Sequence, residues 1–276
     1  MDYPRQLVLF ILFSKCVSVN INRIEVPYLV EMGTESVILD CEYVMNAASG
    51  PGLVVKWFFN GSSGLVYQWI PPMLPQVIGL LKGKVDMNFR ISDEPLQAYR
   101  ALKIIRPTTD LSGNYTCVVS TFIEEDRRTR SMLVYSTGKS FHFVQEKRYV
   151  FIVSLICFAE DLYPKPTMNI MSQSKLLKQA STEIKMNSWG LYSIETKAVV
   201  HDDDVMTPWE EFTCILSLPS ANYTDSRTTI YYPGLMPTAQ IAAIEIGRPQ
   251  QRQSNDSSTT SSARIFLLCS LLLFIK

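Results

Sequence analysis

The chain has 276 residues, of which 26 are Lys or Arg and 26 are Asp or Glu, so its formal net charge is zero. This balance argues against a nucleic-acid-binding protein, which needs an excess of basic side chains. The sequence has only two histidines that could serve in catalysis or zinc binding. A hydrophobic fraction of 47% excludes disorder throughout, and the length favours two domains of ordinary size.

The first 18 residues are typical of a secretory signal peptide. Arg5 precedes an uncharged apolar run over residues 7–13, and compact residues follow it. We expect cleavage before Val19, which places the rest of the chain in an oxidising compartment. A short buried strand or helix is the alternative interpretation.

Four cysteines remain after Cys16 in this segment and Cys269 in the C-terminal tail are set aside. An even number in a secreted chain predicts two disulfides, for which three pairings exist. Pairing neighbours in the sequence gives separations of 76 and 57 residues, which suits one bridge within each sandwich domain of about 100 residues. No two of the four have the close spacing of a zinc site. The four are Cys41, Cys117, Cys157 and Cys214.

The residues around the first two cysteines predict an immunoglobulin-like β-sandwich. The run LVVKWFFNG alternates so that Val55, Trp57 and Phe59 share one face of a strand, with Trp57 expected to pack on the disulfide. In DLSGNYTC, Tyr115 stands two residues before Cys117, the position of the tyrosine corner.

Further short strands complete the first domain. The segment SVILDCEY is expected to bury Val37 and Leu39, and ALKIIRP to bury Leu102 and Ile104. The segment GLVYQWIPP predicts an additional C′ strand, which favours a variable-type sandwich. The last two strands, NYTCVVSTFI and TRSMLVYS, are expected to form a hairpin joined by the charged turn EEDRR. Residues 136–140, STGKS, are predicted to be the domain junction.

A second immunoglobulin-like domain is predicted around Cys157 and Cys214. No tryptophan stands 12 to 14 residues after Cys157, and Ile170 is the candidate substitute. In EEFTCILSL, Phe212 takes the place of the corner tyrosine, which keeps the packing and loses the hydroxyl. We interpret Trp189 and Trp209 as ordinary packing aromatics.

The C-terminal region is typical of a signal for a glycosylphosphatidylinositol (GPI) anchor. The 11 apolar residues 265–275 would span only about 16 Å as a helix, too short for a bilayer core of about 30 Å. A polar spacer with small residues precedes them, and we favour Asn255 as the attachment residue, with Ser254 and Ser257 as competitors. A secreted protein is the alternative. The predicted organisation is a signal peptide (1–18), two all-β domains (19–136 and 137–233), a stalk (234–255) and a removed signal (256–276).

Glycan acceptor motifs occur at Asn60, Asn114, Asn222 and Asn255. We expect occupancy at Asn60 and Asn222, leave Asn114 open, and do not expect a glycan at Asn255 if it carries the anchor.

No motif for catalysis, a cofactor or a metal ion is found in the sequence. A secreted hydrolase, the remote alternative, would have to place His142 or His201 beside a nucleophile in a pocket. The run Asp202, Asp203 and Asp204 lacks the spaced oxygen ligands of a calcium loop, and we interpret it as a solvated turn.

The outward face of strands C, C′, F and G is the predicted partner-binding surface. An aromatic and aliphatic surface on an extracellular sandwich indicates a protein partner. The alternative is a C′ register shifted by one residue, which would place its two aromatics in the core. The two-residue period of a strand predicts six outward side chains: Lys56, Phe58, Thr116 and Val118, and on C′ Tyr67 and Trp69.

The first domain resembles the beaten path family of insect immunoglobulin-superfamily proteins. The resemblance is carried by INRIEVPYLVEMGTESVILDCEY, VVKWFFNG, LVYQWIPP, LKIIRPTTDLSGNYTCVVS and, in the second domain, CFAEDLYPKP. It implies a neuronal recognition protein in axon guidance and synaptic partner choice, whose first domain binds receptors of the sidestep family. Phe58 and Phe59 depart from the more polar segment usual in the family. The alternatives are homophilic adhesion and a secreted immune recognition factor.

Overall fold

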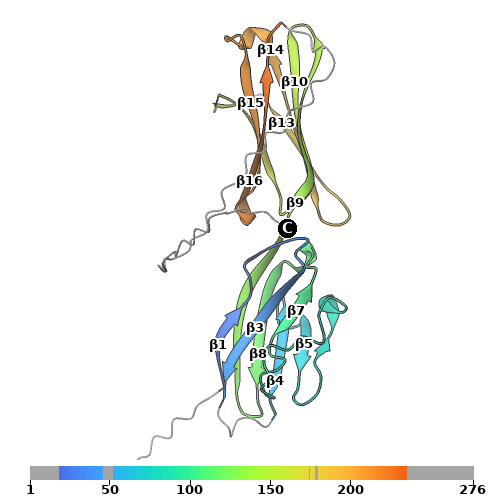
Figure 1. Ribbon diagram of the computed structural model, residues 1–276, viewed down its shortest axis with the longest axis vertical. Helices are drawn as coiled ribbons and strands as arrows, with labels where there is room; N and C mark the ends of the chain where they lie inside the picture. Colours follow the sequence, from blue (N-terminus) through green and yellow to red (C-terminus); the bar gives the residue numbers. More distant parts are fainter. Residues whose placement is uncertain (1–18, 46–51, 174, 178–179, 235–276) are drawn as a thin grey trace, which may run out of the picture. The chain divides into compact units, whose positions relative to one another are not determined.

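The computed structural model describes residues 19–45, 52–173, 175–177 and 180–234. The predicted signal peptide, the stalk from residue 235 onward and the anchor residue Asn255 lie outside these ranges. The described chain forms β-strands with short 3-10 turns and buries two separate hydrophobic cores. In Figure 1 the blue to green strands form one sandwich, and the green to orange strands form the other.

The first sandwich has a three-stranded sheet facing a larger one. The strand order is β1-β3-β7 in the small sheet and β9-β8-β4-β5-β6 in the large one, with β2 pairing in parallel to β9. The strands C′ and C″ of a variable-type domain are β5 and β6. The bounds are β1 (Asn20–Glu25), β2 (Leu29–Glu31), β3 (Ser36–Val44), β4 (Val54–Phe59), β5 (Leu65–Trp69), β6 (Gln76–Val77), β7 (Leu102–Ile105), β8 (Gly113–Ser120) and β9 (Glu125–Tyr149).

The core of the first sandwich confirms the predicted signature. Cys41 and Cys117 form a disulfide, and Trp57, which pairs with Cys117 across β4 and β8, is fully buried. The Trp57 indole N–H donates to the Arg100 carbonyl over 3.2 Å. The Tyr115 hydroxyl donates to the Leu111 carbonyl over 2.9 Å, which is the tyrosine corner. Both polar tips are therefore satisfied inside the core.

The predicted inward residues of two further strands are also confirmed. Val37 and Leu39 on β3 and Leu102 and Ile104 on β7 are all buried. Their alternation follows the two-residue period of a strand that has one face on the core.

The predicted F–G turn is wrong in position. The turn between β8 and β9 is formed by residues 121–124, and the Thr121 N–H donates to the Glu124 carbonyl over 2.8 Å. The charged residues from Glu125 to Arg128 lie in β9 and pair with β8. Charge did not break the strand, because this part of β9 is a sheet edge, where charged side chains reach water.

The predicted junction, residues 136–140, lies inside the continuous strand β9. This strand pairs with β8 over Glu125–Met132 and with β10 from Ser136 to Tyr149, so one sheet of each sandwich shares it. Gly138 has a positive φ of 86°, and a Cβ there would collide with the Glu160 carbonyl. The glycine accommodates an irregularity in the β9–β10 pairing rather than a loop. The domain boundary itself stays a prediction.

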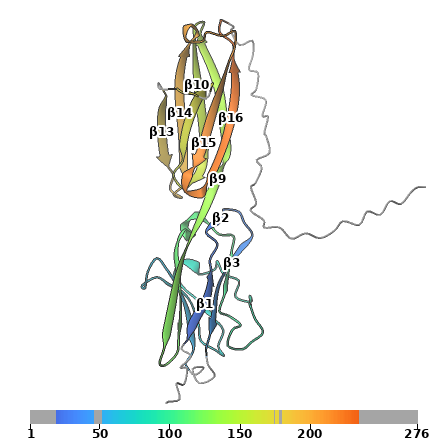
Figure 2. The same ribbon diagram turned by 90° about the vertical axis from the view of Figure 1, so that its left-hand side faces the viewer.

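The second sandwich packs β9, β10, β14 and β13 against a sheet of order β12-β11-β15-β16 (Figure 2). This is the strand distribution of a constant-type domain with a short extra edge strand. The bounds are β10 (Ile152–Tyr163), β11 (Thr167–Ser172), β12 (Lys175–Leu176), β13 (Ser181–Met186), β14 (Tyr192–His201), β15 (Glu210–Leu218) and β16 (Tyr223–Tyr231).

The second core has its own disulfide, Cys157–Cys214, so the sequence-adjacent pairing is confirmed. Ile170 is fully buried and pairs with Cys214, as Trp57 pairs with Cys117 in the first sandwich. Phe212 is buried with its ring centroid 6.4 Å from that of Tyr231. Both substitutes predicted from the sequence therefore occupy the core.

The interpretation of Trp189 and Trp209 as packing aromatics is wrong. Trp189 is 82% exposed and Trp209 is 52% exposed. Trp189 lies in the turn between β13 and β14. There the side-chain oxygen of Asn187 accepts the backbone N–H of Trp189 over 2.9 Å and that of Leu191 over 3.0 Å. Both residues lie in connections at the ends of strands.

A polar cluster closes one end of the second sandwich. The Asp202 carboxylate accepts hydrogen bonds from the Tyr231 hydroxyl and from the Gly234 N–H, the latter over 2.6 Å, and Lys147 lies 3.4 Å away. Burial alone would raise the pKa of Asp202, but these donors lower it. The prediction of a solvated turn is therefore wrong for Asp202, which is buried, while Asp203 and Asp204 are exposed.

Candidate functional site

The exposed face of the large sheet of the first sandwich is defined by its register. Gln76, Gln68, Lys56, Val118 and Arg127 stand opposite one another in a row across β6, β5, β4, β8 and β9. Paired residues in neighbouring strands point to the same side of a sheet. Since Trp57 and Cys117 point into the core, this row points outward.

This face is more polar than predicted. Lys56, Phe58 and Thr116 are half-buried on it, and Val118 is buried in the centre of the row. The Thr116 hydroxyl bonds to that of Thr129 over 2.8 Å. Of the six residues predicted to bind a partner, these four lie on the predicted face, although Val118 is not accessible there.

The outward orientation of Tyr67 and Trp69 is wrong. Each is only 2% exposed, because the register pairs Tyr67 with Trp57 and Trp69 with Val55, both of which face the core. An irregularity in the β4–β5 register shifts the alternation of β5. The Tyr67 hydroxyl donates to the Tyr99 carbonyl over 2.8 Å, and the Trp69 indole to the Met73 carbonyl over 3.0 Å. Burial raises the pKa of Tyr67.

Sequence reasoning missed a group of exposed apolar side chains in the first sandwich. Five side chains in two connections are between 38% and 83% exposed, and we name them the apolar tip. They belong to the turn between β8 and β9 and to the connection between β5 and β6. The C′–C″ and F–G connections lie at the same end of a variable-type domain. The apolar tip consists of Ile70, Met73, Leu74, Phe122 and Ile123.

The register places the two halves of the apolar tip near each other. Strands β5 and β8 both pair with β4, so their chains are about 10 Å apart. Trp69 and Val119 both pair with Val55, and the apolar residues follow these positions within five residues. A signal was available in the sequence, since Phe122 and Ile123 are adjacent apolar residues directly before the charged run. The misplaced turn concealed it.

The N-terminal strand supports the turn that carries Phe122 and Ile123. The Val19 N–H lies 2.7 Å from the Glu124 carboxylate, and the Ile21 N–H lies 2.8 Å from the Asp126 carboxylate. These contacts hold the base of the turn in place.

Two predicted glycan acceptors lie together at the opposite end of the sheet. The Asn60 side-chain oxygen accepts the Asn114 N–H over 2.8 Å, and the Asn114 side-chain oxygen accepts the Ser131 hydroxyl over 2.7 Å. Asn60, Asn114 and Asn222 are all exposed. The first two adjoin the Phe59–Tyr115 pair, whereas the apolar tip adjoins the Val54–Ser120 pair at the other end of β4. Glycans there would leave the tip uncovered; their occupancy stays a prediction.

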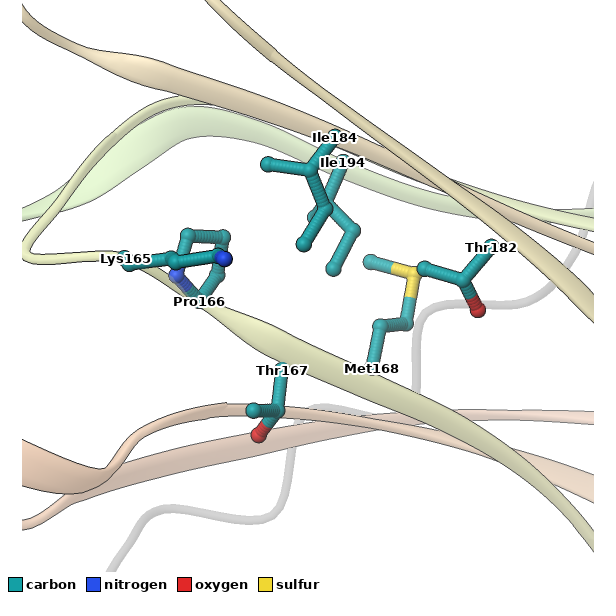
Figure 3. A pocket seen from close by; sticks show the side chains of 7 residues that line it. All are labelled: Lys165, Pro166, Thr167, Met168, Thr182, Ile184 and Ile194. Atoms are coloured by element: carbon teal, nitrogen blue, oxygen red, sulfur yellow. The ribbon is translucent and has the colours of Figure 1, made fainter.

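The two histidines are not placed for the catalysis that a hydrolase would need. His142 on β9 and His201 on β14 are exposed on strands, and neither lines the pocket in Figure 3. That pocket, about 510 Å³, opens between β11 and the β13–β14 hairpin of the second sandwich. Ile184 and Ile194 form one side and Met168 contributes to the other, with Lys165 as the charged residue of the lining (Figure 3).

Two features of residues 19–234, outside the gaps given above, concern metal binding and membrane crossing. Within that part of the chain no group of three or more metal-ligating side chains is gathered. The same residues contain no helix of the length and apolarity that a bilayer crossing requires.

Comparison with known proteins supports the fold alone. No protein-family model and no curated protein matches the chain. Among solved structures, bovine butyrophilin superposes with a TM-score of 0.59 at 16% identity, covering 74% of this chain and 93% of its own. A chain from the crystal structure of ICOS in complex with ICOS-L and an anti ICOS-L VNAR domain gives 0.55 at 14% identity, covering 74% and 98%. The protein therefore has a tandem immunoglobulin-like fold, the first unit variable-type.

Proposed function

We propose that this protein is an extracellular recognition protein whose first sandwich binds another cell-surface protein. Two disulfides suit an oxidising compartment, and three exposed glycan acceptors suit passage through the secretory pathway. From the resemblance to the beaten path family we propose that the protein acts in axon guidance and synaptic partner recognition. The partner is then a sidestep-like immunoglobulin receptor, and the chain is held on the outer membrane surface by a GPI anchor at Asn255.

The apolar tip is the observation that carries this proposal. Large exposed apolar side chains gathered at one end of a soluble domain mark a protein interaction site. Phe122 is the anchor of the site, because aromatic side chains dominate the energetics of binding interfaces. The adjoining sheet face, with Lys56, Gln68 and Arg127, supplies a polar rim around it.

Because Tyr67 and Trp69 are buried, the proposed site is not centred on strand C′. The sequence favoured a face centred on strand C′, whereas the exposed apolar area lies in the C′–C″ connection and the F–G turn. A partner domain that docks on these two connections and on the adjoining end of the sheet would bury on the order of 1,200 to 2,000 Å² in total.

A binding experiment tests the site. The wild-type ectodomain and the double variant Phe122→Ala, Ile123→Ala are measured against a panel of sidestep-like ectodomains. We expect at least a roughly tenfold weaker affinity for the variant, because it removes the anchor of the interface. The matched control is Trp189→Ala, which removes an equally exposed aromatic from the second sandwich.

The outcomes separate the candidate surfaces. Unchanged binding by the tip variant, with loss of binding by Lys56→Ala or Phe58→Ala, would assign the sheet face instead. Aggregation of beads that carry this protein alone would indicate homophilic adhesion. Release of the protein from expressing cells by a phosphatidylinositol-specific phospholipase tests the anchor, and a protein found only in the medium would replace the anchored form with a secreted one.

A further inference from the structure

A second group of exposed apolar side chains lies at one end of the second sandwich. They come from the end of β9 and the turn that follows it, from the connection between β14 and β15, and from the residue after β16. Their exposed fractions lie between 49% and 91%. We name this group the aromatic end; it consists of Tyr149, Phe151, Met206, Trp209 and Tyr232.

The Asp202 cluster holds these three segments together. The Asp202 N–H donates to the Phe151 carbonyl over 3.0 Å, and its own carbonyl accepts the Val205 N–H over 3.1 Å. Its carboxylate binds Tyr231 and Gly234 at the end of β16. Figure 1 shows the start of β10 and the end of β14 at the same end of the sandwich. The backbone and the side chain of one buried residue, Asp202, thus link the three segments that carry the exposed side chains.

The described chain also leaves the second sandwich at this end. Gly234, its last described residue, is bonded to Asp202, and the proposed anchor residue follows 21 positions later. A stretch of 21 residues reaches no further than about 70 to 75 Å even when fully extended. An anchored chain would therefore keep the aromatic end close to the bilayer, at a high effective concentration.

We propose that the aromatic end rests on the surface of a zwitterionic phospholipid bilayer; this rests on the membrane attachment in the proposed function. Trp and Tyr concentrate at the headgroup level of membranes because each has an apolar ring and a polar tip. Asp203 and Asp204 are exposed beside Met206, so an anionic lipid surface would repel this end. The predicted glycan acceptor Asn222 lies in the connection at the opposite end of β15 and β16 and would not intervene.

The two exposed tryptophans of the described chain provide the test. Trp189 precedes β14 and Trp209 follows it, so the ten residues of β14 separate them by about 30 Å. Trp57 and Trp69 are buried in the first core and contribute the same background to every variant. The variant Trp189→Phe keeps the exposed indole of Trp209 at the aromatic end. The variant Trp209→Phe keeps the exposed indole of Trp189 at the opposite end of the sandwich.

The full chain is expressed in animal cells and placed on vesicles of phosphatidylcholine with brominated acyl chains, which quench tryptophan at membrane depth. Attachment is through the chain's own anchor or, for a chain secreted without one, through a C-terminal hexahistidine tag on a chelating lipid. We expect emission of Trp189→Phe to fall on brominated relative to ordinary vesicles, and emission of Trp209→Phe to stay unchanged. Adding Phe151→Glu to Trp189→Phe should abolish the fall, because a charge is costly in the apolar layer.

Equal quenching of both variants, or of neither, would overturn the proposal. Quenching that appears only on vesicles with anionic lipid would also overturn it. Dimerisation of the attached chain that is lost in Phe151→Glu, without quenching, would assign the aromatic end to a second copy instead. Binding of the same proteins to the ectodomain panel reports on the apolar tip, and phospholipase release reports on the anchor, so failure of the proposed function is read out separately.

Discussion

The two sandwiches share one plan and fill it with different residues. In the first, Trp57 packs beside the disulfide and the Tyr115 hydroxyl bonds within the core. In the second, Ile170 and Phe212 take these places and bring no polar group with them. The two sandwiches therefore fill the space beside the disulfide with different side chains, and the first adds a hydrogen bond at its corner residue.

The second sandwich has its main buried polar cluster elsewhere. The hydroxyl absent from Phe212 has a counterpart in Tyr231, which packs against Phe212 and bonds to Asp202 beside Lys147. The side chain of Lys147 is itself almost fully buried. In the second sandwich this charged cluster anchors one end, where three segments converge.

The largest expected effect comes from the residue beside the disulfide. We expect Trp57→Ala to lower the free energy of unfolding of the first sandwich by about 3 to 5 kcal/mol, because it leaves a large cavity. Ile170→Trp, which copies the first core into the second, should cost about 1 to 3 kcal/mol through overpacking. Guanidinium unfolding of each variant gives these values, and an unchanged or raised stability of Ile170→Trp would show that the second core has room for the aromatic.

The charged cluster should be next in effect. We expect Asp202→Asn to lower the unfolding free energy by about 2 kcal/mol, since it removes charge-assisted hydrogen bonds from a buried site. The pKa of Asp202 is lowered in the folded state, so its contribution is present above the ordinary value of about 3.9 and is lost as the pH falls through the folded value. Urea unfolding at pH 7 and below pH 4 should show a smaller acid loss in Asp202→Asn than in the wild type.

Exchanging the two corner residues should give smaller changes. Tyr115→Phe removes the bond to the Leu111 carbonyl and should cost about 1 kcal/mol. Phe212→Tyr adds a hydroxyl in the second core and should cost about 1 kcal/mol if it finds no acceptor, the low end of the range for an unpaired buried hydroxyl. Thermal unfolding measures both, and a stabilised Phe212→Tyr would mean that the second core can form the same corner.

The smallest effect is expected at a surface ion pair of the first sandwich. Lys84 lies 2.7 Å from Asp110, and both side chains are partly exposed. Burial would raise the pKa of Asp110, but the hydrogen bonds from Lys84 and Thr108 lower it. We expect Lys84→Met to cost less than about 1 kcal/mol, and the cost to shrink in high salt. An effect as large as that of Asp202→Asn would contradict the distinction between the two charged sites.

The success of the sequence predictions depended on how local the underlying pattern was. The alternation in β3, β4 and β7 needs only neighbouring residues, and the inward positions were predicted correctly. The orientation of Tyr67 and Trp69 depended on an irregularity in the pairing of β5 with β4. The local sequence pattern does not predict that irregularity. The apolar tip was missed for a related reason, since the position of the F–G turn follows from the pairing of β8 with β9.

The sequence by itself determined the class of fold and the two disulfides, because cysteine spacing, the Trp57 and Tyr115 positions and strand alternation are all written along the chain. Only the tertiary structure decided which aromatic side chains meet water. Strand register and the placement of turns arise from pairing between distant segments, so Trp69 became core while Phe122 and Trp209 became surface.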